Sequence, residues 1–150
     1  MNYTLYIDES GDFQSNNGQW LISGVLFSES YSVCESTFKT KFKSVPSELN
    51  LQSIKQFHLT EFRRNYGHEK AVAMADTFLN KLNKLPFDYH FLATINYCKH
   101  SLSSREKTYR LMLSDLLALC DTVLREGQVI SHLDLVIATR TINGELQTTV

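Results

Sequence analysis

One long amphipathic segment, residues 104–125, limits the folds open to this chain because strand-like segments stand on both sides of it. Its apolar residues recur at helical spacing and form one stripe, as in a helix that packs one face on a core. Ser103 and Glu106 have the spacing of a capping box, and Gly127 is typical of a C-terminal cap. A helix between strands indicates an α/β arrangement. The stripe comprises Tyr109, Met112, Leu113, Leu116, Leu117, Cys120, Val123 and Leu124.

Four segments have the patterns of strands. Residues 3–8 and 19–28 are rich in aromatic and β-branched types, and the turn-forming stretch between them predicts an antiparallel hairpin. Ser10-Gly11 is expected to stop the first strand. Residues 87–97 alternate apolar and polar side chains, as a half-buried strand does, and the apolar series comprises Phe87, Tyr89, Phe91, Ala93 and Ile95. Residues 133–139 are nearly continuous in apolar types, which predicts a central strand buried on both faces.

Two further helices are expected between the second and third strands. Residues 32–43 form the first, with Ser32 as its cap and Pro46 ending it. Residues 57–62 fit either a short strand or a turn that enters a helix, and residues 68–84 form the second helix. Their buried faces are expected to hold Cys34, Phe38 and Phe42 in the first and Ala71, Ala75, Phe78, Leu79 and Leu82 in the second.

The resulting order is β-β-α-α-β-α-β. No repeat, linker or low-complexity segment interrupts it, so we expect a single α/β domain over residues 1–150. Asn143-Gly144 is a hairpin signal, and residues 146–150 look like the start of another strand. Because the chain stops as that strand begins, we expect a fragment or a truncated product.

Charge and cysteine usage narrow the class of protein. Fifteen basic and sixteen acidic residues give a net charge of −1, so the chain lacks the overall basic footprint of a nonspecific nucleic-acid binder. Nucleic acid is not excluded, because an enzyme can hold phosphate through metal ions and a few local cations. Cys34, Cys98 and Cys120 are odd in number and widely spaced, with no CxxC pair, so a disulfide framework is not expected and a reducing compartment is the default. No leader and no membrane-length apolar run is present, so we expect a soluble, cytoplasmic protein.

Asp8 and Glu9 follow an apolar strand directly and stand before a glycine turn. Neighbouring strand residues face opposite sides, so one of the two would project from the sheet and the turn could bring the other round. Carboxylates, water and substrate phosphate oxygens are the ligands of Mg²⁺, and two such ions can cleave a phosphodiester. The alternative is structural, since Asp, Ser and Gly are ordinary turn residues.

The segment Tyr6-Ile7-Asp8-Glu9-Ser10-Gly11-Asp12, followed by the apolar Trp20–Leu26 strand, resembles the N-terminal motif of the domain-of-unknown-function 3800 family. Phe57-His58-Leu59-Thr60-Glu61 is similar to a Leu-His pattern in that family, and Leu133–Ile137 resembles its later central strand. The resemblance implies a ribonuclease-H-like or integrase-like α/β fold, here a mixed sheet flanked by helices. It also implies a nuclease that depends on Mg²⁺ or Mn²⁺, in prokaryotic defence or mobile elements.

Two departures from the family pattern bear on the site. Family members commonly carry an acidic residue at the end of the later strand, where this chain has Ala138-Thr139-Arg140. They also commonly end with a helix that carries a Gln-Leu-Ala-Asp-like motif, which nothing here matches. A ribonuclease-H-like site needs acids from several elements, so this metal site is expected to be incomplete or completed elsewhere.

Four other residues are candidates for the site. His58 and Glu61 are three residues apart and suit a metal ligand or a general base, although a surface pair is the commoner outcome. Arg63, next to Arg64, could hold a phosphate or be solvated. Arg140 lies just beyond the last strand, where open α/β sheets place ligands, and could neutralise a phosphate or face solvent.

The leading hypothesis is a divalent-metal-dependent nuclease acting on RNA or DNA. Asp8 would bind the metal with Glu9 assisting, and His58 or Glu61 would position water or substrate. The second hypothesis is a binding or assembly module that keeps the fold without a complete site. A phosphotransferase of another α/β class is the third, but the second aspartate that the haloacid-dehalogenase pattern requires is Ser10 here.

Overall fold

The computed structural model describes residues 1–11, 19–49, 59–96, 105–125 and 130–138. The chain divides into two compact units. The sheet unit comprises Met1–Tyr31 and Asp88–Val150, and the helical unit comprises Ser32–Phe87. That residues 1–150 form a single domain stays a prediction. None of the described helices is long and apolar enough to cross a bilayer.

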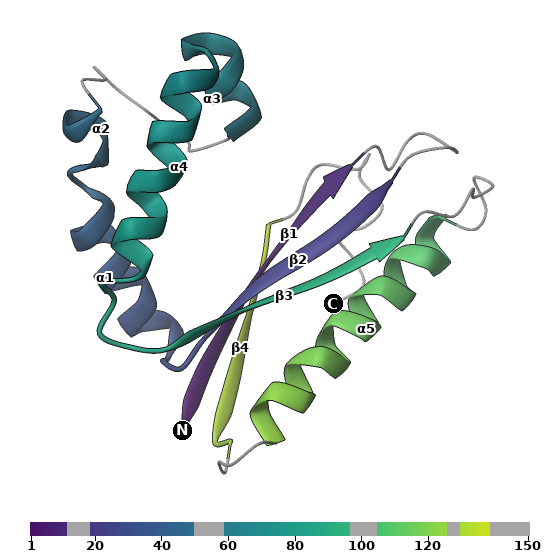
Figure 1. Ribbon diagram of the computed structural model, residues 1–150. Helices are drawn as coiled ribbons and strands as arrows, with labels where there is room; N and C mark the ends of the chain where they lie inside the picture. The colour runs from purple at the N-terminus through teal and green to yellow at the C-terminus, as the bar shows by residue number, and fades with distance from the viewer. Residues whose placement is uncertain (12–18, 50–58, 97–104, 126–129, 139–150) are drawn as a thin grey trace. The chain divides into compact units, whose positions relative to one another are not determined.

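Among the described residues, the sheet unit is built on a four-stranded mixed sheet with the order β3-β2-β1-β4 (Figure 1). The strands are β1 (Asn2–Gly11), β2 (Trp20–Phe27), β3 (Tyr89–Asn96) and β4 (His132–Ile137). β1 pairs antiparallel with β2, which confirms the predicted hairpin, and β2 pairs antiparallel with β3. β4 runs parallel to β1 on its other side. The predicted α/β class is confirmed, and this strand order is consistent with a ribonuclease-H-like fold.

Helix α5 (Arg105–Arg125) connects β3 to β4 and packs on one face of the sheet (Figure 1). The predicted apolar stripe is confirmed in full, because all eight of its residues are buried in this core or packed against it. Gly24 in β2 lets the helix approach closely. A Cβ there would lie 2.9 Å from Leu5 Cδ1 and 3.5 Å from Leu116 Cδ2, and both leucines are fully buried. The core of the sheet side comprises Tyr3, Leu5, Ile7, Trp20, Ile22, Leu26 and Leu92.

Three strand predictions need correction. β1 continues through Ser10 to Gly11, because pairing with Leu21 and Trp20 of β2 extends the ladder past the expected stop. β4 lies at an edge of the described sheet, not at its centre, and Leu135 is 45% exposed. In β3 the residue buried under α5 is Leu92, whereas the alternating series that includes Phe91 and Ile95 faces the other way. An alternating pattern alone does not show which of its two faces a helix will cover.

The described part of the helical unit contains four helices, α1 (Tyr31–Phe42, whose first residue belongs to the sheet unit), α2 (Val45–Glu48), α3 (Leu59–Tyr66) and α4 (His68–Leu82). α3 and α4 pack together around buried Phe62, Ala71 and Met74. Phe42 of α1 stacks on Phe78 of α4 with ring centroids 4.9 Å apart. The Lys81 ammonium holds α2, since it lies 2.8 Å from a Glu48 carboxylate oxygen and 3.0 Å from the Ser44 hydroxyl.

Some helix boundaries differ from the expectation. α1 begins at Tyr31, so Ser32 lies inside the helix; the Tyr31 N–H donates to Asp134 Oδ2 at 3.1 Å. Pro46 occupies the first turn of α2, where a missing N–H costs nothing. The ambiguous segment enters a helix at Leu59. On α4, Leu79 is exposed and the unpredicted Met74 is buried, because contact with α3 selects a different edge of the apolar face.

The remaining predictions on secondary structure fall on residues outside the described ranges. They concern the caps at Ser103 and Gly127, the Asn143-Gly144 turn and the strand at residues 146–150.

The packing of α5 predicts a large difference between two leucines of that helix. Leu116→Ala should lower the free energy of unfolding by about 2–5 kcal/mol, because it opens a cavity where the side chain is fully buried. Leu119→Ala is the matched control, since Leu119 is 43% exposed and its removal should cost well under about 1 kcal/mol. Urea unfolding followed by circular dichroism measures both, and equal decreases would contradict this packing.

Candidate functional site

The alternation of β1 sends Asp8 and Glu9 to opposite faces of the sheet. Glu9 follows Leu5 and Ile7 on the face that α5 covers and is only 5% exposed. Asp8 follows Tyr6 on the other face and is exposed. Because β1 stays regular through Gly11, no turn brings the two carboxylates together. The Asp8 and Glu9 carboxylates would therefore not hold the same metal ion in this arrangement.

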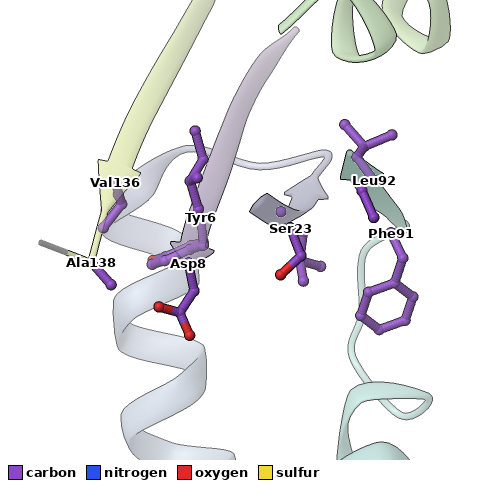
Figure 2. A pocket seen from close by; sticks show the side chains of 11 residues that line it. Tyr6, Asp8, Ser23, Phe91, Leu92, Val136 and Ala138 are labelled. Carbon is purple, nitrogen blue, oxygen red and sulfur yellow. The ribbon is translucent and has the colours of Figure 1, made fainter. Parts of the chain in front are cut away.

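The Asp8 side chain lines a hollow of about 560 Å³ on the sheet face opposite α5. All the residues that line the hollow belong to the four strands or, in the case of Ala138, directly follow β4. In Figure 2, Asp8 lies between Ala138 on one side and Ser23 on the other, with Phe91 farther along the face. The lining comprises Tyr6, Ile7, Asp8, Ser23, Gly24, Val25, Phe91, Leu92, Ala93, Val136 and Ala138.

Neighbouring strands fix the surroundings of Asp8. Its Oδ1 accepts the Glu9 backbone N–H at 2.8 Å, which orients the carboxylate. Ser23 is its directly paired residue on β2 and adds a hydroxyl to the hollow. The Ala138 N–H donates to the Ile7 carbonyl at 2.9 Å, so Ala138 lies beside Asp8 across the parallel pair. The end of β4 thus brings a methyl group, not a carboxylate, to this position.

Glu9 has a different partner on the covered face. Its side chain accepts a hydrogen bond from the Tyr109 phenol near the start of α5. Burial, followed by this hydrogen bond and the Glu9 charge, raises the pKa of Tyr109 above its ordinary value of 10.0. The pair joins β1 to α5 at the residue that follows Asp8. Glu9 is therefore held in a buried contact that fixes the local direction of β1.

The described residues supply few metal ligands. No group of three His, Cys, Asp or Glu side chains among them is placed to hold a metal ion. Asp8 offers one exposed carboxylate, with the Ser23 hydroxyl opposite it. This donor set suits a hard cation that keeps several waters, as Mg²⁺ does, and not a cation that needs a full protein cage.

The other predicted site residues lie outside the described residues or on elements other than β1. His58 and Arg140 lie outside the described residues. Glu61 lies on α3, but its side chain is not described. Arg63 is an exposed residue of α3 in the helical unit. Asp115, a carboxylate in the middle of α5, is exposed.

The sequence does not predict that Ser23 and Tyr109 lie in this neighbourhood. Ser23 becomes a neighbour of Asp8 only through the hairpin register, which the turn between the strands does not announce. Tyr109 reads as the first apolar residue of the α5 stripe, and its hydroxyl gives no local signal of a partner on β1. Each of the two residues contacts a segment that is distant from it in the sequence.

No protein-family model, curated protein or solved structure matches this chain. The resemblance to the domain-of-unknown-function 3800 family stays a hypothesis that rests on the motif around Asp8.

The raised pKa of Tyr109 predicts a pH dependence of stability. A phenol whose pKa is higher in the folded than in the unfolded protein stabilises the fold below pH 10.0, and that contribution disappears as the pH rises above this value. The free energy of unfolding should therefore fall above pH 10.0, and less steeply in Tyr109→Phe. Urea unfolding at a series of pH values measures this. Parallel curves for the two proteins would contradict a raised pKa of Tyr109, whose main cause is burial.

Proposed function

We propose that this chain is a divalent-metal-dependent nuclease domain that hydrolyses phosphodiester bonds of RNA or DNA. The observation that carries the proposal is the placement of Asp8. Its exposed carboxylate lies in a hollow near the carboxyl ends of two adjacent parallel strands, β1 and β4. Ligands of open α/β sheets bind at such strand ends.

Asp8 would bind Mg²⁺ or Mn²⁺, a Lewis acid that would polarise a phosphoryl oxygen and activate a water molecule. The Glu9 N–H bonded to Oδ1 keeps one Asp8 oxygen in place, and the second oxygen can face the cation. The Ser23 hydroxyl can donate to a metal-bound water or a phosphate oxygen. Glu9 itself assists indirectly in this proposal, because its buried side chain secures the strand through Tyr109.

Further groups are needed for catalysis and remain proposals. His58 and Glu61 would position water or substrate, and Arg63 and Arg140 would neutralise phosphate charge. A cytoplasmic location is also a proposal, based on three widely spaced cysteines that do not suggest a disulfide framework.

A specific observation favours a second candidate, a ribonuclease-H-like binding or assembly module without catalysis. Ala138 occupies the strand end beside Asp8, where a second carboxylate would be needed. With Glu9 on the other face, the described part of the chain supplies Asp8 as the sole carboxylate lining the hollow. A single carboxylate can bind one hydrated cation but does not by itself clamp two.

The two candidates differ in a nuclease assay on labelled single- and double-stranded RNA and DNA, with Mg²⁺ or Mn²⁺. Asp8→Ala should lower the cleavage rate by at least about a hundredfold, because it removes the metal ligand that polarises the phosphate. The matched control is Asp76→Ala, which removes an exposed carboxylate of α4 and should leave the rate unchanged.

Each outcome of this assay selects one candidate. Cleavage by the wild type that chelation and Asp8→Ala both abolish supports the nuclease. A folded wild-type protein without activity on any substrate and in either metal overturns it and leaves the module. Equal rates in wild type and Asp8→Ala show that the cleavage does not depend on Asp8 and overturn the proposed site.

A further inference from the structure

A cluster of cations surrounds the junction of α3 and α4 in the helical unit. Residues 63–70 contain three Lys or Arg residues and one carboxylate, whereas the whole chain carries a net charge of −1. Arg63, Arg64 and Lys70 are exposed, as is His68. No described carboxylate forms an ion pair with any of the three cations. The surface around residues 63–70 is therefore basic, although the whole chain is close to neutral.

The junction holds these side chains on a fixed backbone. Gly67 alone separates the two helices, with a φ of 87° that side chains other than glycine rarely adopt. Its N–H donates to the Arg63 carbonyl at 3.0 Å, and its carbonyl accepts the Ala71 N–H at 3.2 Å. The turn is therefore tight and hydrogen-bonded on both sides. Cations held in this way lose less entropy on binding an anion than cations on a loose loop.

An aromatic ring lies within the same cluster. Tyr66 is 40% exposed, and its ring lies against buried Phe62 with centroids 4.6 Å apart. The Lys70 ammonium lies 5.9 Å from the Tyr66 ring centroid. Because the lysine stem is flexible, a flat apolar group can take its place on the ring while the ammonium moves to a neighbouring anion. Phe62 keeps the platform in position.

From this combination we infer that the α3–α4 junction is a binding surface for single-stranded nucleic acid. Arg63 and Arg64 hold consecutive phosphates, and an unpaired base stacks on Tyr66 with Lys70 beside it. Cationic grooves with an aromatic stacking platform bind single strands in this way, because every unpaired base offers a π-face that a duplex keeps covered. An acidic peptide would use the cations but would have no need for the ring. The inference rests on the proposed function for its substrate class and extends it to unpaired strands.

The test measures binding separately from cleavage. Fluorescence anisotropy of a labelled single-stranded oligonucleotide is titrated with the full chain in the presence of a chelator, so that no metal-dependent step contributes. Arg63→Ala/Arg64→Ala should weaken binding and should reduce the slope of log affinity against log salt by roughly 0.7 for each phosphate that is no longer neutralised. The matched control Lys41→Ala/Lys43→Ala removes two exposed cations of the same unit and should keep the wild-type slope.

The aromatic platform has its own variants. Tyr66→Ala should weaken single-strand binding by about five- to 150-fold, the effect of removing the stacking partner of one base, while Tyr66→Phe keeps the ring and the affinity. Duplex of the same sequence should bind more weakly than the single strand and should not respond to Tyr66→Ala. A duplex preference, or competition by a polyglutamate peptide as strong as that of the oligonucleotide, overturns the inference.

The outcomes also separate this inference from the proposed function. Asp8→Ala should bind the single strand as the wild type does, even though it cannot cleave. Binding that depends on the junction without cleavage upholds the inference and overturns the nuclease. Cleavage that persists at the wild-type rate in Arg63→Ala/Arg64→Ala, with binding unchanged, overturns the inference and the phosphate role of Arg63 but leaves the nuclease at Asp8 in place. Equally weakened binding in the lysine control reduces the effect to total charge and overturns the inference as well.

Discussion

The alternation of side chains along β1 governs the rest of the sheet unit. β1 is hydrogen-bonded on both edges, antiparallel to β2 and parallel to β4, so its register cannot slip without breaking two ladders. Leu5 and Ile7 on one face form the floor on which α5 packs. Asp8 on the other face enters the hollow. Core and candidate site are thus two sides of one strand, and each fixes the orientation of the other.

The sequence predicted those parts of the fold that depend on local periodicity. The α5 stripe is confirmed because eight apolar residues at helical spacing leave a single face to bury. The β1–β2 hairpin is confirmed because two strand patterns joined by a short turn-forming stretch are also a local feature. The errors concern interactions between segments. Pairing with β2 extends β1 past Ser10, and packing against α3 buries Met74 instead of Leu79. Neither contact can be read from the residues next to it in the sequence.

The candidate site was predictable in position but not in composition. An acid at the end of an apolar strand identified Asp8, since strand ends are where α/β sheets hold ligands. That Glu9 turns to Tyr109, that Ser23 is the cross-strand neighbour and that Ala138 lies on the remaining side all follow from register and helix packing. A motif names the residues of a site, whereas the fold decides which of them face the same way.

The parallel pairing of β1 with β4 has a consequence for how the protein is made. The Met1 amino group lies 3.2 Å from the Ser131 hydroxyl, 130 residues later in the chain. During synthesis β1, β2 and β3 leave the ribosome well before β4 does. The surroundings of Asp8 are therefore complete only after β4 has been synthesised. Until then the edge of β1 that β4 will occupy is unpaired and must be kept from other strands.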